Sequence, residues 1–301
     1  MQIIESLYIF GIYGQYGVIN NFIVGFMTKI AFQGQLGAYS HLACSILKPD
    51  ATPIAYDSFF QAIDAVENDH AEWAMIPIEN STAGRVEEIY RQIPKTKLRI
   101  IAEHFQPVSH CLMALPNSNP SWVMSHPQAL AQCHDRIIAL GLEPRAEFDT
   151  AGAAKILSES KDLTGSVIAS ELAAELYGMT IVYRQFEDIH NNTTRFMLLA
   201  KQDVAVIYDV QKTYITSILF KVKNIPAALY KALGGFATNG LNLIKLESYM
   251  DGKTLNSSQF HIDIAGHIDS KTMQLAIEEL KFYSSEFRWL GTYEAQPFRE
   301  L

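Results

Sequence analysis

The sequence is poor in cysteine, and its three cysteines form no CxxC pair. An odd number of thiols at wide spacings does not supply a disulfide framework, so we expect free thiols and a reducing, cytoplasmic compartment. The cysteines and histidines of the middle region also lack the spacing of a zinc site, so we expect no metal there and assign these residues to packing. They are His104, His110, Cys111, Cys133 and His134, and the remaining cysteine is Cys44.

Positive charge is also scarce. The chain has 32 acidic and 24 basic residues, a formal net charge of −8 and a pI near 5.6. It contains no basic run and no alternation of basic with aromatic residues, so we expect no nucleic-acid partner.

Charge of either sign is absent from residues 6–28, which are rich in Ile, Phe, Tyr and Gly. The stretch lacks the positive segment of a secretory signal, and its glycines and amides make it a poor membrane helix. Met27 and Thr28 lead directly into an expected strand, so we interpret residues 1–27 as a non-native or dispensable extension. Membrane association and targeting remain alternatives for this segment, although we expect no membrane partner.

The chain does have enough apolar residues for a full core. Its 301 residues are 49% hydrophobic and 19% charged, which suits two domains or a two-lobed unit with an added module. From Lys29 onward, short apolar runs alternate with segments of 3.6-residue period, which predicts an α/β region. A buried strand over 73–78 would deliver Glu79, Asn80 and Ser81 at its end.

The second half of the α/β region begins at Ser125, which we expect to cap one helix that ends at Gly141. After a last strand at 195–200, the weakly periodic segment 201–213 marks a domain boundary. The elements that follow predict a ferredoxin-like βαββαβ domain. Their expected ranges are 215–222, 226–238, 243–248, 259–264, 272–283 and 287–292.

Four separated motifs occur in the order typical of one family. They are IAFQGQLGAYS at 30–40, PIENS at 77–81, SHPQ at 125–128 with Gln132, and NTTRF at 192–196. Each motif is weak alone, but together they resemble the prephenate dehydratases. The resemblance implies a catalytic domain over 28–205, with two α/β lobes like those of periplasmic binding proteins, and an ACT regulatory domain over 214–294.

The resemblance also implies an activity, a carbon–oxygen lyase reaction in L-phenylalanine biosynthesis. Prephenate would lose its ring hydroxyl as water and its ring carboxylate as CO2, and phenylpyruvate would form. Because aromatisation drives this step, we expect no cofactor and no metal. The protein must bind two carboxylates and assist the departing hydroxyl with a proton or a hydrogen bond.

Site residues follow from the motifs. Arg195 could hold a carboxylate bidentately, and the helix starts after Gly37 and Ser125 could take the other anionic group. The Thr194 hydroxyl would assist the leaving group. The expected catalytic residues are Thr194, Glu79, Ser125 and Gln132. The expected substrate-binding residues are Arg195, Asn80, Ser81, Gly37, Tyr39, Ser40, His126, Gln128 and Phe196.

The expected ACT domain departs from its family. Pro226-Ala227-Ala228-Leu229 stands where relatives have a Gly-Ala-Leu segment, and Glu247-Ser248-Tyr249-Met250 stands where they have Glu-Ser-Arg-Pro. Ala227 adds a Cβ where relatives have glycine, and Tyr249-Met250 removes a charge and a rigid turn. We still expect L-phenylalanine to bind at Ala227, Ala228, Leu229, Glu247 and Ser248, in a homodimer or homotetramer.

Other functions remain open. Arogenate dehydratase, a catalytically silent amino-acid sensor and a solute-binding protein are the rival hypotheses. A serine hydrolase is disfavoured, because His126 lies beside Ser125 in a helix start and no GxSxG elbow occurs.

Overall fold

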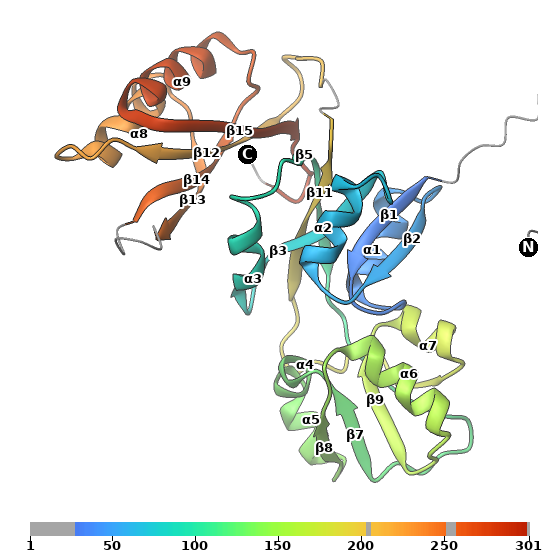
Figure 1. Cartoon of the computed structure of the whole chain (residues 1–301). Helices are drawn as coiled ribbons and strands as arrows, with labels where there is room; N and C mark the ends of the chain where they lie inside the picture. Colours follow the sequence, from blue (N-terminus) through green and yellow to red (C-terminus); the bar gives the residue numbers. More distant parts are fainter. Residues whose placement is uncertain (1–27, 203–205, 251–256, 300–301) are drawn as a thin grey trace, which may run out of the picture.

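In a computed structural model of the chain, residues 28–202, 206–250 and 257–299 are described, and they form three β-sheets with helices (Figure 1). The expected extension over residues 1–27 lies outside the described residues. The first sheet, together with the helices that cover it, is called lobe 1. Its strand order is β2-β1-β3-β11-β5, and the short β4 pairs with the end of β3. These strands are β1 (Lys29–Gln33), β2 (Thr52–Tyr56), β3 (Trp73–Asn80), β4 (Gly84–Arg85), β5 (Arg99–Pro107) and β11 (Thr193–Ala200).

The helices of lobe 1 are α1 (Tyr39–Leu47), α2 (Phe59–Glu67) and α3 (Glu87–Gln92). Ser58 caps α2, since its side chain accepts a hydrogen bond from the backbone N–H of Gln61. Helix α1 packs on one face of the sheet, where Phe196 and Leu198 of β11 are buried. Helices α2 and α3 pack on the other face, with Met197 and Leu199. Strand β11 is therefore covered on both of its faces.

The second sheet, lobe 2, has the order β10-β6-β9-β7-β8. Its strands are β6 (Cys111–Ala114), β7 (Trp122–Ser125), β8 (Glu143–Ala146), β9 (Gly165–Ala169) and β10 (Thr180–Tyr183), and its helices are α4 (Pro127–Gln132), α5 (His134–Ala139), α6 (Thr150–Ser160) and α7 (Glu171–Tyr177). The chain enters this lobe after β5 and returns to lobe 1 through β11, so it crosses between the lobes twice (Figure 1). The predicted two-lobed α/β architecture is confirmed.

One helix of lobe 2 differs from the prediction. The single helix expected from Ser125 to Gly141 is two short helices, α4 and α5, which meet at Cys133. Ser125 is the last residue of β7 and not a helix cap. The cap of α4 is His126, whose Nδ1 accepts from the Gln128 N–H at 3.2 Å. The expected capping box of Ser125 and Gln128 is therefore wrong.

The third sheet belongs to the C-terminal module and has the order β13-β14-β12-β15. Its elements are β12 (Tyr214–Val222), α8 (Ala228–Thr238), β13 (Leu243–Met250), β14 (Ser257–Ala265), α9 (Lys271–Tyr283) and β15 (Ser284–Glu294), which confirms the predicted βαββαβ order. Both helices pack on one face of this sheet. Ile215, Leu219 and Tyr293 on its other face share a core with α2 and α3 of lobe 1.

The C-terminal module and lobe 1 touch closely. A Cβ added to Gly291 of β15 would lie 2.0 Å from the backbone oxygen of Ile100 in β5. Only glycine fits at such a backbone contact. The module is therefore attached to lobe 1 by a shared apolar core and not only by the connecting segment.

Candidate active site

A cavity of about 380 Å³ lies between the two lobes. Lobe 1 supplies the ends of β3 and β11, the turn into β4 and one residue of α1, while lobe 2 supplies α4 and the start of α6. The segments that cross between the lobes complete the lining. The lining residues are Tyr39, Asn80, Ala83, Gly84, Arg85, Val86, Val108, His110, His126, Gln128, Ala129, Gln132, Asp149, Thr150, Asn192 and Thr194.

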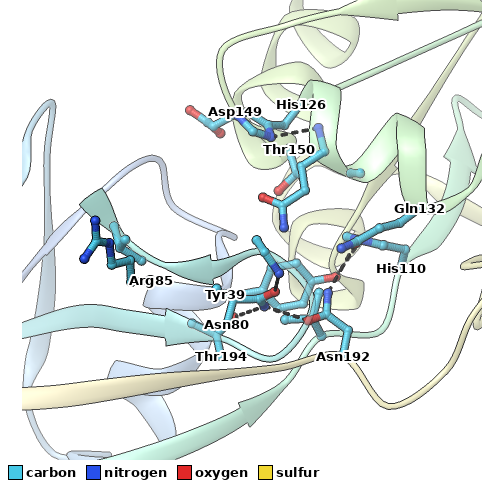
Figure 2. Close-up of a pocket in the computed structure, with 16 residues that line it drawn as sticks. Tyr39, Asn80, Arg85, His110, His126, Gln132, Asp149, Thr150, Asn192 and Thr194 are labelled. Carbon is cyan, nitrogen blue, oxygen red and sulfur yellow. Dashed lines mark hydrogen bonds between the residues drawn. The ribbon is translucent and has the colours of Figure 1, made fainter. Parts of the chain in front are cut away.

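Asn80 and Thr194 lie at the lobe 1 side of this cavity (Figure 2). They face each other in the antiparallel pairing of β3 with β11. The Asn80 Nδ2 donates to Thr194 Oγ1 at 2.9 Å and to Asn192 Oδ1 at 2.6 Å. Because the Thr194 oxygen accepts here, its own proton is available to a group in the cavity.

The orientation of the Asn80 amide is fixed from its other end. Its Oδ1 accepts from the backbone N–H of Thr82 at 3.0 Å, from the Thr82 hydroxyl at 2.8 Å and from the backbone N–H of Ala83 at 2.9 Å. These three donors require an oxygen, so the Nδ2 group must point at Thr194 and Asn192. The turn between β3 and β4 thus sets the donor that reaches Thr194.

Gln132 of α4 joins the two lobes across the cavity (Figure 2). Its Nε2 donates to the Thr82 hydroxyl at 3.0 Å. Its Oε1 accepts from Asn192 Nδ2 at 3.2 Å and lies 2.9 Å from His110 Nε2. Gln128 lies one turn earlier in α4 and lines the same cavity.

His110 is a residue whose place in the cavity the sequence did not indicate. Only 3% of it is exposed, and its Nδ1 lies 3.0 Å from the hydroxyl of Tyr39, which itself donates to the Ser109 carbonyl at 2.7 Å. The other ring nitrogen, Nε2, lies 2.9 Å from Gln132 Oε1. Burial lowers the pKa of His110, so the ring is neutral at neutral pH.

Arg195 does not line the cavity, which corrects its expected role in holding a substrate carboxylate. Its side chain points to the opposite face of β11 from Thr194 and is 2% exposed. The Nε donates to Glu103 Oε2 at 2.8 Å, and Nη1 donates to Asp263 Oδ2 and to Glu79 Oε1, both at 2.9 Å. The Nη2 donates to the Tyr293 hydroxyl at 3.0 Å. A guanidinium used in this way is not available to a ligand.

Glu79 shares the face of Arg195, not that of Asn80. Its second oxygen, Oε2, accepts from Lys245 Nζ of the C-terminal module at 2.8 Å. Burial alone would raise the pKa of Glu79, but Lys245 and Arg195 outweigh it and hold the pKa below its usual value. For Asp263, burial is likewise outweighed by Arg195, and the pKa lies well below its usual range. Glu79 is thus an ionised partner in this cluster and not an acid in the cavity, which corrects its expected catalytic role.

Several other predicted residues also lie outside the cavity lining. Ser125 is fully buried, and its hydroxyl donates to the Ile168 carbonyl at 2.6 Å. Phe196 is buried in the core under α1, and Ser40 is 9% exposed within α1. The Ser81 hydroxyl accepts from the Thr193 N–H at 2.9 Å, which fastens the ends of β3 and β11. These four positions support the site and do not face it, so their expected substrate-binding or catalytic roles are corrected.

Gly37 holds the lobes together and does not line the cavity. Its carbonyl accepts from the Ser170 hydroxyl at 2.5 Å, and a Cβ on Gly37 would lie 2.9 Å from the Cα of Ala173 in α7. Its φ of +94° also favours glycine. The motif glycine therefore allows lobe 1 to approach lobe 2, where a direct role in binding was expected.

The residues expected to bind an amino acid lie on α8 and β13. Ala227 precedes α8 with a φ of +56°, a left-handed conformation that is unusual for alanine. Ala228 is buried, and Leu229 packs on the module's core. Glu247 points toward lobe 1, where its Oε2 lies 3.3 Å from Arg85 Nη1, while Ser248 is exposed.

Within the described residues there is no group of three or more His, Cys, Asp or Glu placed to hold a metal ion. No helix in the described part of the chain is long and apolar enough to span a membrane.

The structure thus combines two α/β lobes, a cavity between them and an attached βαββαβ module, which is the architecture of a two-lobed protein with an ACT-like domain. The family model of prephenate dehydratase matches residues 30–204. The bifunctional N-acyl-homoserine lactone acylase/prephenate dehydratase of Komagataeibacter europaeus is 44% identical over 273 residues, which are 90% of this chain and 97% of that protein. The chain therefore belongs to the prephenate dehydratase family, and the resemblance read from the four motifs is confirmed.

Two further relatives show the range of this family. Arogenate dehydratase/prephenate dehydratase 2 of Arabidopsis thaliana is 34% identical over 281 residues, which are 89% of this chain and 73% of that protein. The crystal structure of prephenate dehydratase from Arthrobacter aurescens in complex with L-Phe superposes with a TM-score of 0.81 at 27% identity. The superposition covers 89% of this chain and 90% of that one.

Proposed function

We propose that this protein is a prephenate dehydratase, which converts prephenate to phenylpyruvate, water and CO2. The observation that carries the proposal is the Thr194 hydroxyl, which lines an interlobe cavity and accepts a hydrogen bond from Asn80 at 2.9 Å. In this reaction the C–O bond to the ring hydroxyl and the C–C bond to the ring carboxylate both break. The electrons of the C–C bond complete the aromatic ring, and the hydroxyl leaves with one proton as water.

The residues of the cavity suit a departing hydroxyl. Thr194 can donate its proton in a hydrogen bond to the leaving oxygen. The Asn80 amide polarises the threonine hydroxyl by donating to its oxygen. Gln132 and the neutral His110 provide fixed polar groups nearby without a positive charge. A cation beside the ring carboxylate would stabilise the ground state of the group that must leave, so neutral surroundings favour its loss.

Arogenate is the second candidate substrate, because it differs from prephenate in an amino group in place of the keto oxygen. One observation favours it: Asp149 lines the cavity and is an acid that could meet an ammonium group. Its Oδ1 accepts from the Gly152 N–H at 2.5 Å, so the carboxylate is held in place at the start of α6.

A second activity is proposed from another cavity. A space of about 600 Å³ shares Tyr39 with the first one, and its walls combine apolar residues such as Leu42 and Leu172 with polar and charged ones such as Gln106, Glu175 and Arg184. A wall with both apolar and polar parts suits an acyl chain that carries a polar head. The K. europaeus relative is named an N-acyl-homoserine lactone acylase as well as a prephenate dehydratase. Release of homoserine lactone from its N-acyl derivative tests this activity, and its absence ends the proposal.

The C-terminal module is proposed to bind L-phenylalanine and to modulate the enzyme as a homodimer or homotetramer. The complex of the A. aurescens enzyme with L-Phe supports this proposal. Ala227 and the pair Tyr249-Met250, which depart from the family pattern, weaken it. If saturating L-phenylalanine changes neither turnover nor melting temperature, this part of the proposal fails.

The first experiment mixes purified protein with prephenate at neutral pH and follows phenylpyruvate by its absorbance in alkali. Arogenate is run beside it, and the Thr194→Ala variant serves as the matched control. Turnover of prephenate that the variant loses supports the proposal. Turnover of arogenate alone assigns the second substrate, and no turnover of either by folded protein rejects a dehydratase in favour of the silent amino-acid sensor.

A further inference from the structure

Arg85 is the only lysine or arginine among the described residues that line the cavity. It lies in β4, which pairs with the end of β3 directly after the turn that Asn80 organises. Figure 2 shows Arg85 on the side of the pocket away from His110, apart from the group formed by Asn80 and Thr194. The cavity therefore has one strong positive charge, and this charge is set apart from the proposed place of the leaving hydroxyl.

The guanidinium of Arg85 contacts the exposed acid Glu87, the partly buried acid Glu247 and the ring of Tyr90, whose centroid lies 5.4 Å away. Its Nε lies 2.5 Å from Glu87 Oε1, and its Nη1 lies 3.3 Å from Glu247 Oε2 in β13. The side chain of Arg85 is 45% exposed, and the contact to Glu247 is longer than the roughly 2.7–2.9 Å of a strong charge-assisted bond. Ion pairs that water reaches contribute little, and the Glu247 contact is long, so the guanidinium can exchange partners at small cost.

Two cations near β3, Arg195 of lobe 1 and Lys245 of the C-terminal module, are already paired with acids. Arg195 is buried against three carboxylates, and Lys245 is 7% exposed and paired with Glu79.

Prephenate carries two carboxylates, and only the one on the pyruvyl side chain is kept in the product. A cation on that retained group binds substrate and transition state alike, so it lowers KM and leaves kcat unchanged.

We propose that Arg85 binds the retained carboxylate of the substrate and that Glu247 of the C-terminal module competes for the same guanidinium. The inference rests on the proposed dehydratase function and extends it to regulation. When the module presents Glu247 to Arg85, the cavity loses part of its attraction for the substrate. When β13 moves away, the attraction increases. Because coupling between two sites is reciprocal, substrate binding then weakens the hold of the module on lobe 1.

Four variants test this inference: Arg85→Gln, Glu247→Gln, the double variant, and Glu294→Gln. The last also removes one acid from the module, but its partner is Lys212 and it does not line the cavity. Loss of a charge-assisted carboxylate contact predicts a KM increase of roughly 10- to 100-fold in Arg85→Gln, with kcat within about twofold. Glu247→Gln lowers KM by about two- to fivefold, and this effect vanishes in the double variant. Glu294→Gln changes neither constant.

Equilibrium binding of phenylpyruvate gives a readout that does not need turnover. Phenylpyruvate keeps the pyruvyl carboxylate, so its Kd follows the same order in the four variants. Arg85→Lys, which keeps the charge but loses the planar fork, has an intermediate Kd. An unchanged Kd in folded Arg85→Gln, or a Glu247→Gln effect that persists in the double variant, overturns the inference. Absence of turnover by the wild-type protein instead rejects the proposed function, and the phenylpyruvate titration still decides the role of Arg85.

Discussion

The amide of Asn80 donates to the hydroxyl oxygen of Thr194 across two paired strands, at 2.9 Å. Each residue would be an ordinary strand-end side chain alone. Together they make a hydroxyl whose acceptor position is filled by the protein and whose proton is left for a ligand. The geometry is fixed before any ligand arrives, because three donors from the following turn hold the Asn80 oxygen.

Thr194→Val is expected to lower kcat for prephenate by about 10²- to 10³-fold, the range for loss of a preorganised donor. Valine keeps the branched shape, so the melting temperature should shift only slightly, and Thr194→Ser should keep most of the activity. Asn80→Asp places an acceptor against the threonine oxygen, which draws the hydroxyl proton away from the cavity and lowers kcat in the same way. Wild-type kcat in Thr194→Val would remove this residue from the mechanism.

Arg195→Met is expected to lower the free energy of unfolding by about 3–5 kcal/mol, because Asp263 would remain buried without its cation and Glu103 would keep only Arg299. Denaturant titration measures this loss. Lys201→Met is the control, since its partner Asp69 is exposed and the pair is worth under about 1 kcal/mol. An unchanged unfolding midpoint with a raised KM would return Arg195 to substrate binding.

Gly37→Ala is expected to separate the lobes, because the new Cβ would meet the Cα of Ala173, and backbone cannot move aside as a side chain can. We expect a fall in kcat/KM and a larger radius of gyration in solution scattering. Gly178→Ala, in a position with φ of +66° and no heavy atom within 4 Å of the added Cβ, isolates the backbone cost of about 1–2 kcal/mol. Equal behaviour of the two variants would contradict the contact between the lobes.

Ala227→Gly is expected to raise the free energy of unfolding by up to about 1 kcal/mol. Glycine removes the cost of about 1–2 kcal/mol that alanine has in a left-handed conformation. The greater conformational entropy of glycine in the unfolded chain offsets roughly 0.5–1 kcal/mol of this stabilisation. Ala228→Gly, one residue further and at the start of α8, should destabilise the module instead. Calorimetry of both variants, with and without L-phenylalanine, also shows whether the Cβ of Ala227 obstructs the effector.

The stability of the protein should fall as the pH drops below about 6.5. Burial lowers the pKa values of His110 and His41 below the 6.5 of an ordinary histidine, so the unfolded chain takes up protons that the native state does not. Stability from this source is complete above pH 6.5 and is lost toward the folded pKa values, by at most about 1.4 kcal/mol per pH unit for each histidine. His110→Gln should flatten this slope in urea titrations from pH 7 to 5, and His70→Gln, an exposed histidine, is the control. A steeper slope in His110→Gln would refute the assignment.

The order of strands and helices could be predicted because buried strands and amphipathic helices have different periods. The face of the sheet to which each motif side chain points could not be predicted. Strand β11 is covered on both faces, so apolar alternation does not tell whether Thr194 or Arg195 meets the cavity. The adjacent Glu79 and Asn80 present the same ambiguity in β3. Because successive side chains of a strand point to opposite faces, a shift of one residue decides whether a side chain meets the cavity or the ionic cluster around Arg195.

Other differences have local or distant causes. Ser125 and His126 can both cap a helix, and β7 extends through Ser125 because its hydroxyl bonds to Ile168 in the neighbouring strand. His110 obtains its partners from Tyr39 and Gln132, which lie 71 and 22 residues away. Asn192 was within a recognised motif, but its contact to Asn80 spans 112 residues. Such contacts exist only once the chain has folded.

The placement of β11 also sets the order in which the molecule can be completed during synthesis. Lobe 2 is a continuous segment and can close its sheet as soon as β10 has emerged from the ribosome. Lobe 1 cannot complete its sheet at that stage, since β11 lies between β3 and β5. Both of those strands have an unpaired edge while some 85 intervening residues are translated. The arrival of residues 193–200 closes the sheet and brings Thr194 to Asn80 in a single event. A nascent chain stalled before this strand would have a folded second lobe and no active site.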